Sequence, residues 1–370
     1  MQKEIGSNFD LAPGVLLHQG EDVDLRNYGI TGSDYALLST GRSAESLALD
    51  EIERRNPEIK KVALIPPFTC GTVIAPFLQN GYHLETYTID ENLNVDGEKF
   101  SEELVNSGAQ VVLLHQYFGF QTIWNIEKII EDASKGGVVF IEDRTQCLYS
   151  DFPILPVDYV VGSFRKWAAL PDGGFVACRK GALLDKPYKS DCQLEEEKMA
   201  AAQMKYRYLH EDKGHKQDFL NKFKIAEDTL NLQNQYFKMS PSSLKVQSGI
   251  DIEELRRKRR ENYARIYERL KNPQRVHLVT PEVNEREVPL YCALSVDHRT
   301  KLQEKLRDNM IYAPIVWPKS DICPGVCTAA DKLYRTILCL PIDQRYDIDD
   351  MDRMLDCIEE FEKDASDKTT

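Results

Sequence analysis

The sequence has no excess of basic residues, no long uninterrupted apolar run, and little glycine or proline. Its 47 Lys and Arg are outnumbered by 60 Asp and Glu, so the net charge of −13 repels nucleic acid and anionic lipid surfaces. Together the 20 glycines and 17 prolines account for 37 of 370 residues, too few for a collagen-like or disordered chain. We therefore expect a globular protein without a nucleic-acid partner.

Signals for export and for membrane insertion are also missing. Residues 1–14 contain neither a basic region nor an apolar core. The longest stretch without charged side chains, residues 62–84, holds three prolines and the polar pair Gln79 and Asn80, so lipid could not satisfy its backbone. The nine cysteines are scattered and odd in number, which is typical of reduced thiols. We expect a cytoplasmic protein with no membrane partner.

Short apolar runs alternate with helix-length amphipathic segments over residues 30–180. Near-continuous hydrophobicity in such runs is typical of strands that are covered on both faces, and helices are expected at 42–54 and 125–134. The pattern predicts an α/β fold with a doubly wound, mostly parallel sheet. The expected strands are 61–66, 84–90, 110–115, 137–142, 158–162 and 174–178.

The length predicts two domains, at about 150 residues per domain. We expect a large α/β domain over residues 1–240, which includes surface helices in the Glu- and Lys-rich segment 182–235, and a smaller C-terminal α+β domain over 241–370. Within the smaller domain the apolar spacing predicts helices at 252–270 and 348–361 and strands at 288–295, 313–317 and 336–340.

Three motifs could carry chemistry, and each also has an ordinary structural explanation. The first is the turn at residues 39–45, where small and hydroxyl residues open a helix; it could bind a phosphate or be a simple helix cap. The second is Asp143, at the carboxyl end of a strand, where ligands bind in open α/β sheets and where acidic surface turns also occur. The third is Lys166, which could act as a Schiff-base amine or be an exposed cation.

The order of these motifs favours a common role. Pyridoxal phosphate requires a phosphate cradle, a carboxylate beside its ring nitrogen and a lysine that holds it covalently. No metal site is expected, because the Cys323 and Cys327 pair has no partner pair of Cys or His in the sequence. His115 could pack in the core or form a hydrogen bond to a cofactor.

The chain resembles the DegT/StrS family of pyridoxal-phosphate sugar aminotransferases, which are fold-type I enzymes. The resemblance is carried by Thr-Gly-Arg-Ser-Ala at 40–44, Ala-Leu-Ile-Pro-Pro-Phe-Thr at 63–69, Tyr-Phe-Gly at 117–119, Glu-Asp-x-x-Gln at 142–146 and the spacing from Lys166 to the Gly-Gly pair at 173–174. It implies a large pyridoxal-phosphate domain followed by a smaller C-terminal domain.

The resemblance also implies roles for individual residues. Lys166 would hold the cofactor and move a proton, and Asp143 would pair with its ring nitrogen. Gln146 would approach the ring's phenolic oxygen. The phosphate would be held by Gly41, Arg42, Ser43 and Ser163, and Cys70 stands where the family has the aromatic residue that stacks on the ring.

The sequence departs from the family pattern at a few of these positions. Arg42 stands where Thr is common, and Ser163 lies two residues closer to Lys166 than usual. Gln116 replaces a usual His, and Tyr236 replaces the Asn that a neighbouring subunit lends to the phosphate.

The function implied by the resemblance is transfer of an amino group. We expect a homodimer that moves the amino group of glutamate to a nucleotide-linked keto-sugar in polysaccharide or glycan biosynthesis. The family's dehydratases carry His where this chain keeps Lys166, which favours aminotransfer. Two alternatives stay open: a pyridoxal-phosphate enzyme of another type, such as a lyase or amino-acid aminotransferase, and a catalytically silent binding or regulatory protein.

Overall fold

A seven-stranded sheet forms the centre of the larger part of the molecule. The structure, a computed structural model, describes residues 3–17, 20, 22–233, 235–270, 274–323 and 327–366. One strand, β8, runs antiparallel to both neighbours and the other strands are parallel. The order across the sheet is β2 (Asp34–Leu38), β8 (Gly174–Cys178), β7 (Tyr159–Ser163), β6 (Val139–Asp143), β5 (Val111–His115), β3 (Val62–Ile65) and β4 (His83–Thr86).

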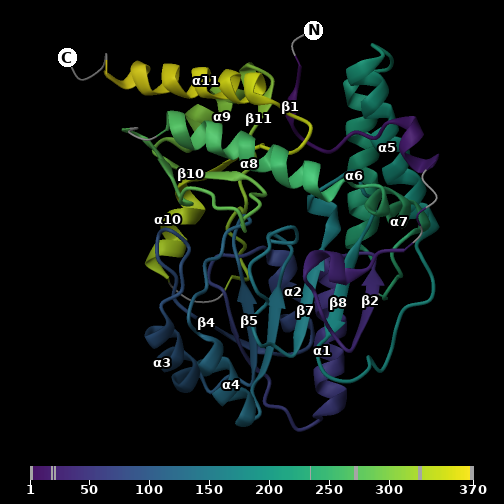
Figure 1. Cartoon of the computed structure of the whole chain (residues 1–370), viewed down its shortest axis with the longest axis vertical. Helices are drawn as coiled ribbons and strands as arrows, with labels where there is room; N and C mark the ends of the chain where they lie inside the picture. Colours follow the sequence, from purple (N-terminus) through teal and green to yellow (C-terminus); the bar gives the residue numbers. More distant parts are fainter. Residues whose placement is uncertain are drawn as a thin grey trace.

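Helices cover both faces of this sheet, which confirms the predicted doubly wound architecture (Figure 1). In β5, Val111 and Leu113 pack with one set of helices, while Val112 and Leu114 pack with the other, as the alternation of strand side chains requires. The first face carries α1 (Gly41–Arg55) and α2 (Gly71–Gln79), and the second carries α3 (Gly97–Ser107) and α4 (Glu127–Lys135).

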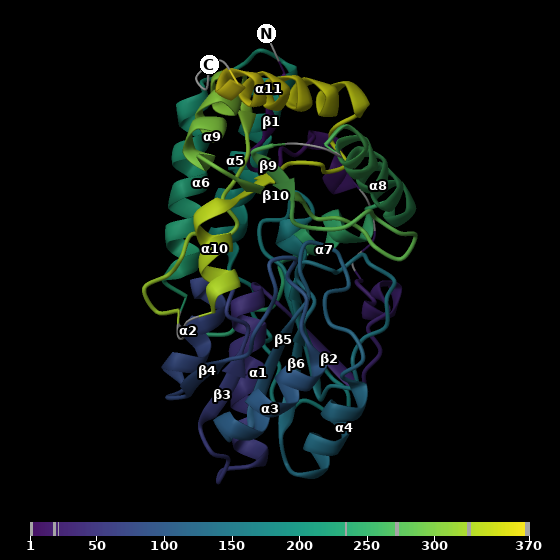
Figure 2. The same cartoon turned by 90° about the vertical axis from the view of Figure 1, so that its left-hand side faces the viewer.

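A second, smaller unit lies above the carboxyl edge of the sheet (Figures 1 and 2). Its antiparallel sheet has the order β12 (Ile337–Leu340), β10 (Cys292–Val296) and β9 (Val276–Leu278). The helices of this unit are α8 (Ile252–Arg269), α9 (Arg299–Asp308), α10 (Thr328–Thr336) and α11 (Ile348–Ser366). Near the amino terminus, β1 (Ile5–Gly6) pairs in parallel with β11 (Ile311–Tyr312), so this segment joins the smaller unit. The domain boundary at residue 240 stays a prediction.

Two long helices fill the segment 182–235, as its composition predicts. They are α5 (Cys192–His210) and α6 (Lys216–Asn231), and both views place them side by side along the smaller unit. Leu194, Ala226 and Leu230 form the small apolar cluster that packs one against the other. The next helix is α7 (Pro241–Ser248), and short 3₁₀ turns occupy Pro13–Leu17, Leu25–Tyr28 and Phe164–Lys166.

Two sequence-based expectations for the smaller unit need correction. The segment 313–317 forms no strand, because the pairing with β1 ends at Tyr312 and Pro314 has no N–H group for a ladder. The expected strand 288–295 begins only at Cys292, after Pro289.

The part of the chain that the structure describes has neither a membrane-spanning helix nor a cluster of metal-ligating side chains. None of its helices is both long and apolar enough to cross a membrane. Nor does that part contain a group of three or more His, Cys, Asp or Glu side chains that could hold a metal ion.

Candidate active site

Three polar side chains lie at one edge of the large sheet and on one of its faces. Because β5, β6 and β7 are parallel, their carboxyl ends meet at the same edge. Ile141 and Val161 pack on the face covered by α1 and α2, so the residues two positions later point to the same face. These residues are Asp143 and Ser163, and His115 is in register with Asp143 on the neighbouring strand.

Asp143 is a buried carboxylate with one oxygen free. Its side chain is 8% exposed, and Oδ1 accepts a hydrogen bond of 2.7 Å from the Thr145 N–H. Oδ2 lies 3.9 Å from His115 Nδ1 and accepts no hydrogen bond from the described residues. This oxygen can therefore accept a hydrogen bond from a ligand.

His115 packs as an aromatic ring beside Asp143. Its ring stacks on Tyr117 with centroids 4.7 Å apart, and neither ring nitrogen has a hydrogen-bond partner among the described residues. Burial lowers the pKa of His115, and the nearby Asp143 only partly opposes that effect. The imidazole is thus neutral at pH 7.

The start of α1 provides free backbone donors next to Ser163. Thr40 caps the helix by accepting a hydrogen bond of 2.9 Å from the Ser43 N–H, so the cap that the sequence left as an alternative is present. Gly41 and Arg42 follow it, and first-turn N–H groups have no acceptor within their own helix. A Cβ at Gly41 would lie 3.2 Å from Ser163 Cβ, which shows how closely the turn approaches the end of β7.

The Arg42 side chain does not point back to this turn. Its guanidinium donates to the Leu230 carbonyl at 3.0 Å and to Asn231 Oδ1 at 3.4 Å, at the end of α6. Burial and the neighbouring Arg165 lower the pKa of Arg42. Only the backbone N–H of Arg42 can therefore contribute to the candidate phosphate turn.

The Gly-Gly pair after Lys166 packs directly against this turn. Gly173 donates its N–H to the Ser39 carbonyl at 2.6 Å and has φ of +130°, a conformation that favours glycine. A Cβ at Gly174 would lie only 2.2 Å from the Thr40 carbonyl carbon. The pair thus lets the chain after Lys166 contact the candidate phosphate turn.

Hydrogen bonds to Asp172 connect the loop between Lys166 and Gly174 to α7. Its carboxylate accepts hydrogen bonds from the Ser240 N–H at 3.1 Å and from the hydroxyls of Ser240 and Ser243 at 2.9 and 2.5 Å. Burial outweighs these bonds and raises the pKa of Asp172 to about 6.

We expect this shift to make stability depend on pH. Between pH 4 and 6 the folded protein keeps the Asp172 proton, whereas the unfolded chain, with a pKa of 3.8, loses it, so rising pH favours unfolding. From pH 4 to pH 6, the free energy of unfolding of the unmodified protein should fall by about 3 kcal/mol relative to that of the Asp172→Asn variant. Urea titrations of both proteins at several pH values measure this difference; a difference that stays constant with pH would contradict it.

Lys166 ends a short 3₁₀ turn and opens onto a cavity of about 620 Å³. Lys166 is exposed to solvent at this cavity. The surrounding protein still removes part of its hydration, and this loss, with Arg165 beside it, lowers the pKa of Lys166. The cavity lies between α5, α6, the amino-terminal residues 6–9 and the smaller unit.

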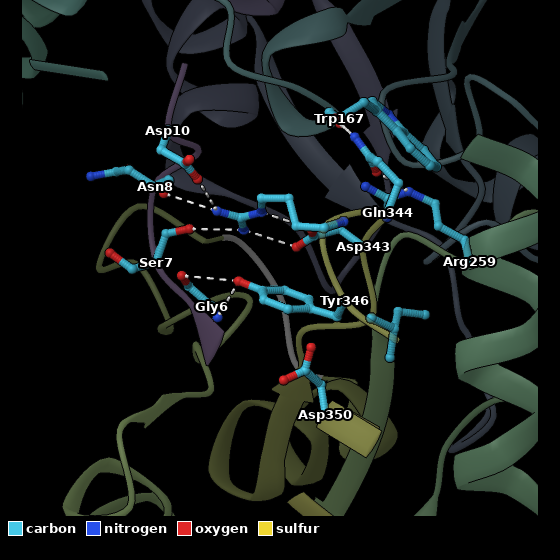
Figure 3. A network of polar contacts seen from close by, with 12 residues as sticks. Gly6, Ser7, Asn8, Asp10, Trp167, Arg259, Asp343, Gln344, Tyr346 and Asp350 are labelled. Atoms are coloured by element: carbon cyan, nitrogen blue, oxygen red, sulfur yellow. Dashed lines mark hydrogen bonds and ion pairs between the residues drawn. The ribbon is translucent and has the colours of Figure 1, made fainter. Parts of the chain in front are cut away.

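Trp167 fixes the backbone next to Lys166. The Trp167 indole donates to the Thr145 carbonyl at 2.8 Å, which connects it to the loop that follows Asp143. Figure 3 shows Gln344 between Trp167 and Arg259: its amide donates to the Trp167 carbonyl at 2.8 Å and its oxygen accepts from Arg259 at 3.0 Å. Residues of the large sheet domain and of the smaller unit thus both hold Trp167, the residue that follows Lys166 in the chain.

Figure 3 also shows polar contacts between the amino-terminal segment and the segment that contains Asp343 and Tyr346. Arg345 pairs with Asp343 at 2.7 Å and donates to the Asn8 carbonyl at 3.1 Å. The Gly6 N–H donates to the Tyr346 hydroxyl at 2.6 Å. These contacts hold the amino-terminal segment as one wall of the cavity.

The structure brings only part of the predicted site into this cavity. Lys166 lines it, whereas Asp143, Gln146, Cys70 and the turn at 41–43 do not. Gln146 uses its oxygen to accept a hydrogen bond of 2.7 Å from the Phe118 N–H. Cys70 is partly buried at the start of α2. The predicted residues thus lie at one sheet edge, and only the lysine reaches the open space.

Sequence reasoning missed a buried acid on α1. Glu45 is 3% exposed, and its Oε1 has no hydrogen-bond partner among the described residues. Burial, followed by the charge of Asp143, raises the pKa of Glu45 well above its usual value. The sequence signal that could have revealed this buried acid is its position between the apolar residues Ala44 and Leu47. Burial and the charge of Asp143 thus both favour the protonated form of Glu45.

A charged cluster beside Lys166 was also missed. Glu227 Oε1 accepts a hydrogen bond from Arg165 at 2.7 Å and another from Lys198. Three different segments supply these residues, so their sequence spacing gave no signal.

The fold is shared with sugar aminotransferases of known structure. PseC from Helicobacter pylori, an aminotransferase involved in the biosynthesis of pseudoaminic acid, matches with a TM-score of 0.70 and 14% identity over 98% of this chain and 100% of PseC. The sugar aminotransferase CalS13 from Micromonospora echinospora matches with a TM-score of 0.66 and 16% identity over 97% and 99% of the two chains.

A DegT DnrJ EryC1 StrS aminotransferase from Brucella abortus matches with a TM-score of 0.65 and 17% identity over 96% and 91% of the chains. No protein-family model and no curated protein sequence matches the chain. Identities this low establish the fold alone. The chain has the fold-type I architecture of the pyridoxal-phosphate aminotransferases, as the sequence predicted.

Proposed function

We propose that the protein is a pyridoxal-phosphate aminotransferase. The observation that carries the proposal is the placement of Lys166, which opens onto the cavity from the strand after the one that ends in Asp143. The residues fit the cofactor: Asp143 Oδ2 is free to accept a hydrogen bond from a protonated ring nitrogen, and the start of α1 offers N–H groups beside Ser163.

Each part of the site would have a distinct task. The N–H groups of Gly41 and Arg42, with the dipole of α1 and the hydroxyls of Ser43 and Ser163, would hold the phosphate. Pyridoxal phosphate supplies a ring that stabilises negative charge at the substrate carbon.

The remaining groups would act on the ring and on protons. Asp143 would keep the ring nitrogen protonated, and Gln146 would orient the ring through its amide group. The lowered pKa of Lys166 favours the neutral amine, which can hold the cofactor covalently and then carry a proton to and from the substrate carbon.

The charge of the cavity supports an anionic substrate. Apart from Lys166, its lining holds five Lys or Arg side chains and two acidic ones, a local excess of three positive charges in a chain of net charge −13. The cationic side chains are Arg165, Lys198, Arg259, Arg307 and Arg345, and the acidic ones are Glu227 and Asp343. Such a lining suits a nucleotide-linked keto-sugar as acceptor and glutamate as donor. We place this reaction in the cytoplasm, in glycan biosynthesis, with a homodimer as the working form.

A panel assay tests the substrate class. The cofactor-loaded protein is mixed with single amino donors, and absorbance reports conversion of the bound cofactor to its amine form. Nucleotide keto-sugars or 2-keto acids are then added to reverse the conversion. We expect glutamate to drive the first step and keto-sugars the second. Reversal by keto acids alone would indicate an amino-acid aminotransferase, and conversion by no donor would indicate another reaction type or a silent protein.

A further inference from the structure

The paired helices α5 and α6 form one wall of the cavity into which Lys166 opens. Lys198 and Ala202 of α5 line the cavity, as do Phe223 and Glu227 of α6. Each pair is four residues apart, so both members lie on the same face of their helix. The apolar contact of Leu194 with Ala226 and Leu230 holds the two helices together behind this face.

A charged cluster joins this wall to the segment that carries Lys166. Arg165 and Lys198 both donate to the same oxygen of Glu227, with Arg165 at 2.7 Å. The other oxygen, Oε2, accepts no hydrogen bond from the described residues. The Lys198 side chain is 8% exposed and that of Arg165 is 17% exposed, whereas that of Glu227 is 47% exposed.

The cluster carries more positive charge than Glu227 can balance. Burial, and then Arg165, lower the pKa of Lys198 to about 8. Burial alone would raise the pKa of Glu227, but Arg165 and Lys198 keep it below its usual value, so Glu227 is ionised. A buried lysine and a partly buried arginine that share one carboxylate oxygen favour the arrival of a further anion.

We propose that Arg165 and Lys198 bind the carboxylate of the amino donor, and that Glu227 holds the two cations in place and competes with that carboxylate. The inference rests on the proposed aminotransferase function. The amino-bearing carbon of the donor must come close to Lys166. The donor's carboxylate is bonded to that same carbon. The carboxylate must therefore bind within the cavity onto which Lys166 opens. The residues assigned to the cofactor phosphate, at 41–43 and 163, do not line this cavity.

Opposite effects of two substitutions test the proposal. Glutarate, the dicarboxylate skeleton of glutamate, is titrated calorimetrically into the protein saturated with pyridoxal phosphate. Lys198→Met removes a cation and should weaken glutarate binding about tenfold, whereas Glu227→Gln removes the competing charge and should tighten it several-fold. Lys198→Arg keeps the charge and should bind like the unmodified protein.

A matched control lies on the same helices. Lys222 pairs with Glu197 at 2.7 Å, and neither residue lines the cavity, so Lys222→Met should leave glutarate affinity unchanged. If the Lys198–Glu227 ion pair served only to hold the structure together, both Lys198→Met and Glu227→Gln would weaken glutarate binding. That result, or no change in either, would overturn the proposal.

Two further arms separate the alternatives. Inorganic phosphate is titrated in parallel, and a loss of phosphate affinity in Lys198→Met without a loss of glutarate affinity would assign the cluster to a phosphate and overturn the proposal. In steady-state assays, Lys198→Met should raise the KM for glutamate while kcat and the KM for the acceptor change little. The glutarate titration is repeated without pyridoxal phosphate, so carboxylate binding is measured even if the proposed cofactor role of Lys166 fails.

Discussion

Replacing Lys166 by arginine is expected to abolish turnover while leaving the fold intact. The guanidinium keeps a positive charge at the cavity, but it stays protonated and cannot hold the cofactor covalently or act as a base. Loss of proton transfer alone should lower kcat by about 10² to 10⁴-fold, and loss of the covalent link adds to that. Single-turnover absorbance measurements with glutamate provide the rate.

The control for this substitution is a lysine outside the cavity. Lys222→Arg, on α6, should turn over like the unmodified protein, because Lys222 does not line the cavity. A Lys166→Arg variant with near-normal turnover would show that another group performs the chemistry, and the assignment of Lys166 would then be wrong.

A methyl group at Gly174 should damage both stability and cofactor binding. The added Cβ would lie 2.2 Å from the Thr40 carbonyl carbon and 2.6 Å from the Gly41 nitrogen, which real structures cannot accommodate. Either β8 or the start of α1 must shift. We expect Gly174→Ala to lower the free energy of unfolding by about 1 to 3 kcal/mol, as overpacking does elsewhere. Because the shift displaces the proposed phosphate turn, affinity for pyridoxal phosphate should also fall.

A glycine in open space serves as the control for Gly174→Ala. A Cβ at Gly14 would meet no atom within 4 Å, so Gly14→Ala should be nearly neutral. Urea unfolding and cofactor titration of both variants measure the two effects. A Gly174→Ala protein that binds pyridoxal phosphate with normal affinity would place the phosphate elsewhere than at the start of α1.

The sequence predicted most of the large sheet because its strands are buried on both faces. Continuous apolar runs revealed β3 and β5 to β8, and helix spacing revealed α1, α4, α8 and α11. Strand β2 was missed because its sequence, Asp-Tyr-Ala-Leu-Leu, begins with an acid and lacks the β-branched residues that favour strands. The pairing of β1 with β11 joins residues about three hundred positions apart, and no local pattern encodes such a contact.

The site was predictable where strand geometry alone decides it. Asp143 was predicted at the carboxyl end of a strand, where the general rule for α/β sheets places ligands, and it lies at the end of β6. Ser163 was predicted only from the family resemblance, and it lies at the end of β7. The cluster of Arg165, Lys198 and Glu227 was not predictable, because it depends on how α5 and α6 pack against the sheet edge. Glu45 was missed because acidic side chains are rarely fully buried.

The central claim is that Lys166 holds pyridoxal phosphate covalently. The most direct test is to incubate the protein with pyridoxal phosphate, reduce the mixture with borohydride and map the modified peptide by mass spectrometry. The account predicts one stoichiometric adduct on Lys166. No adduct, or an adduct on another cavity lysine such as Lys198, would contradict it.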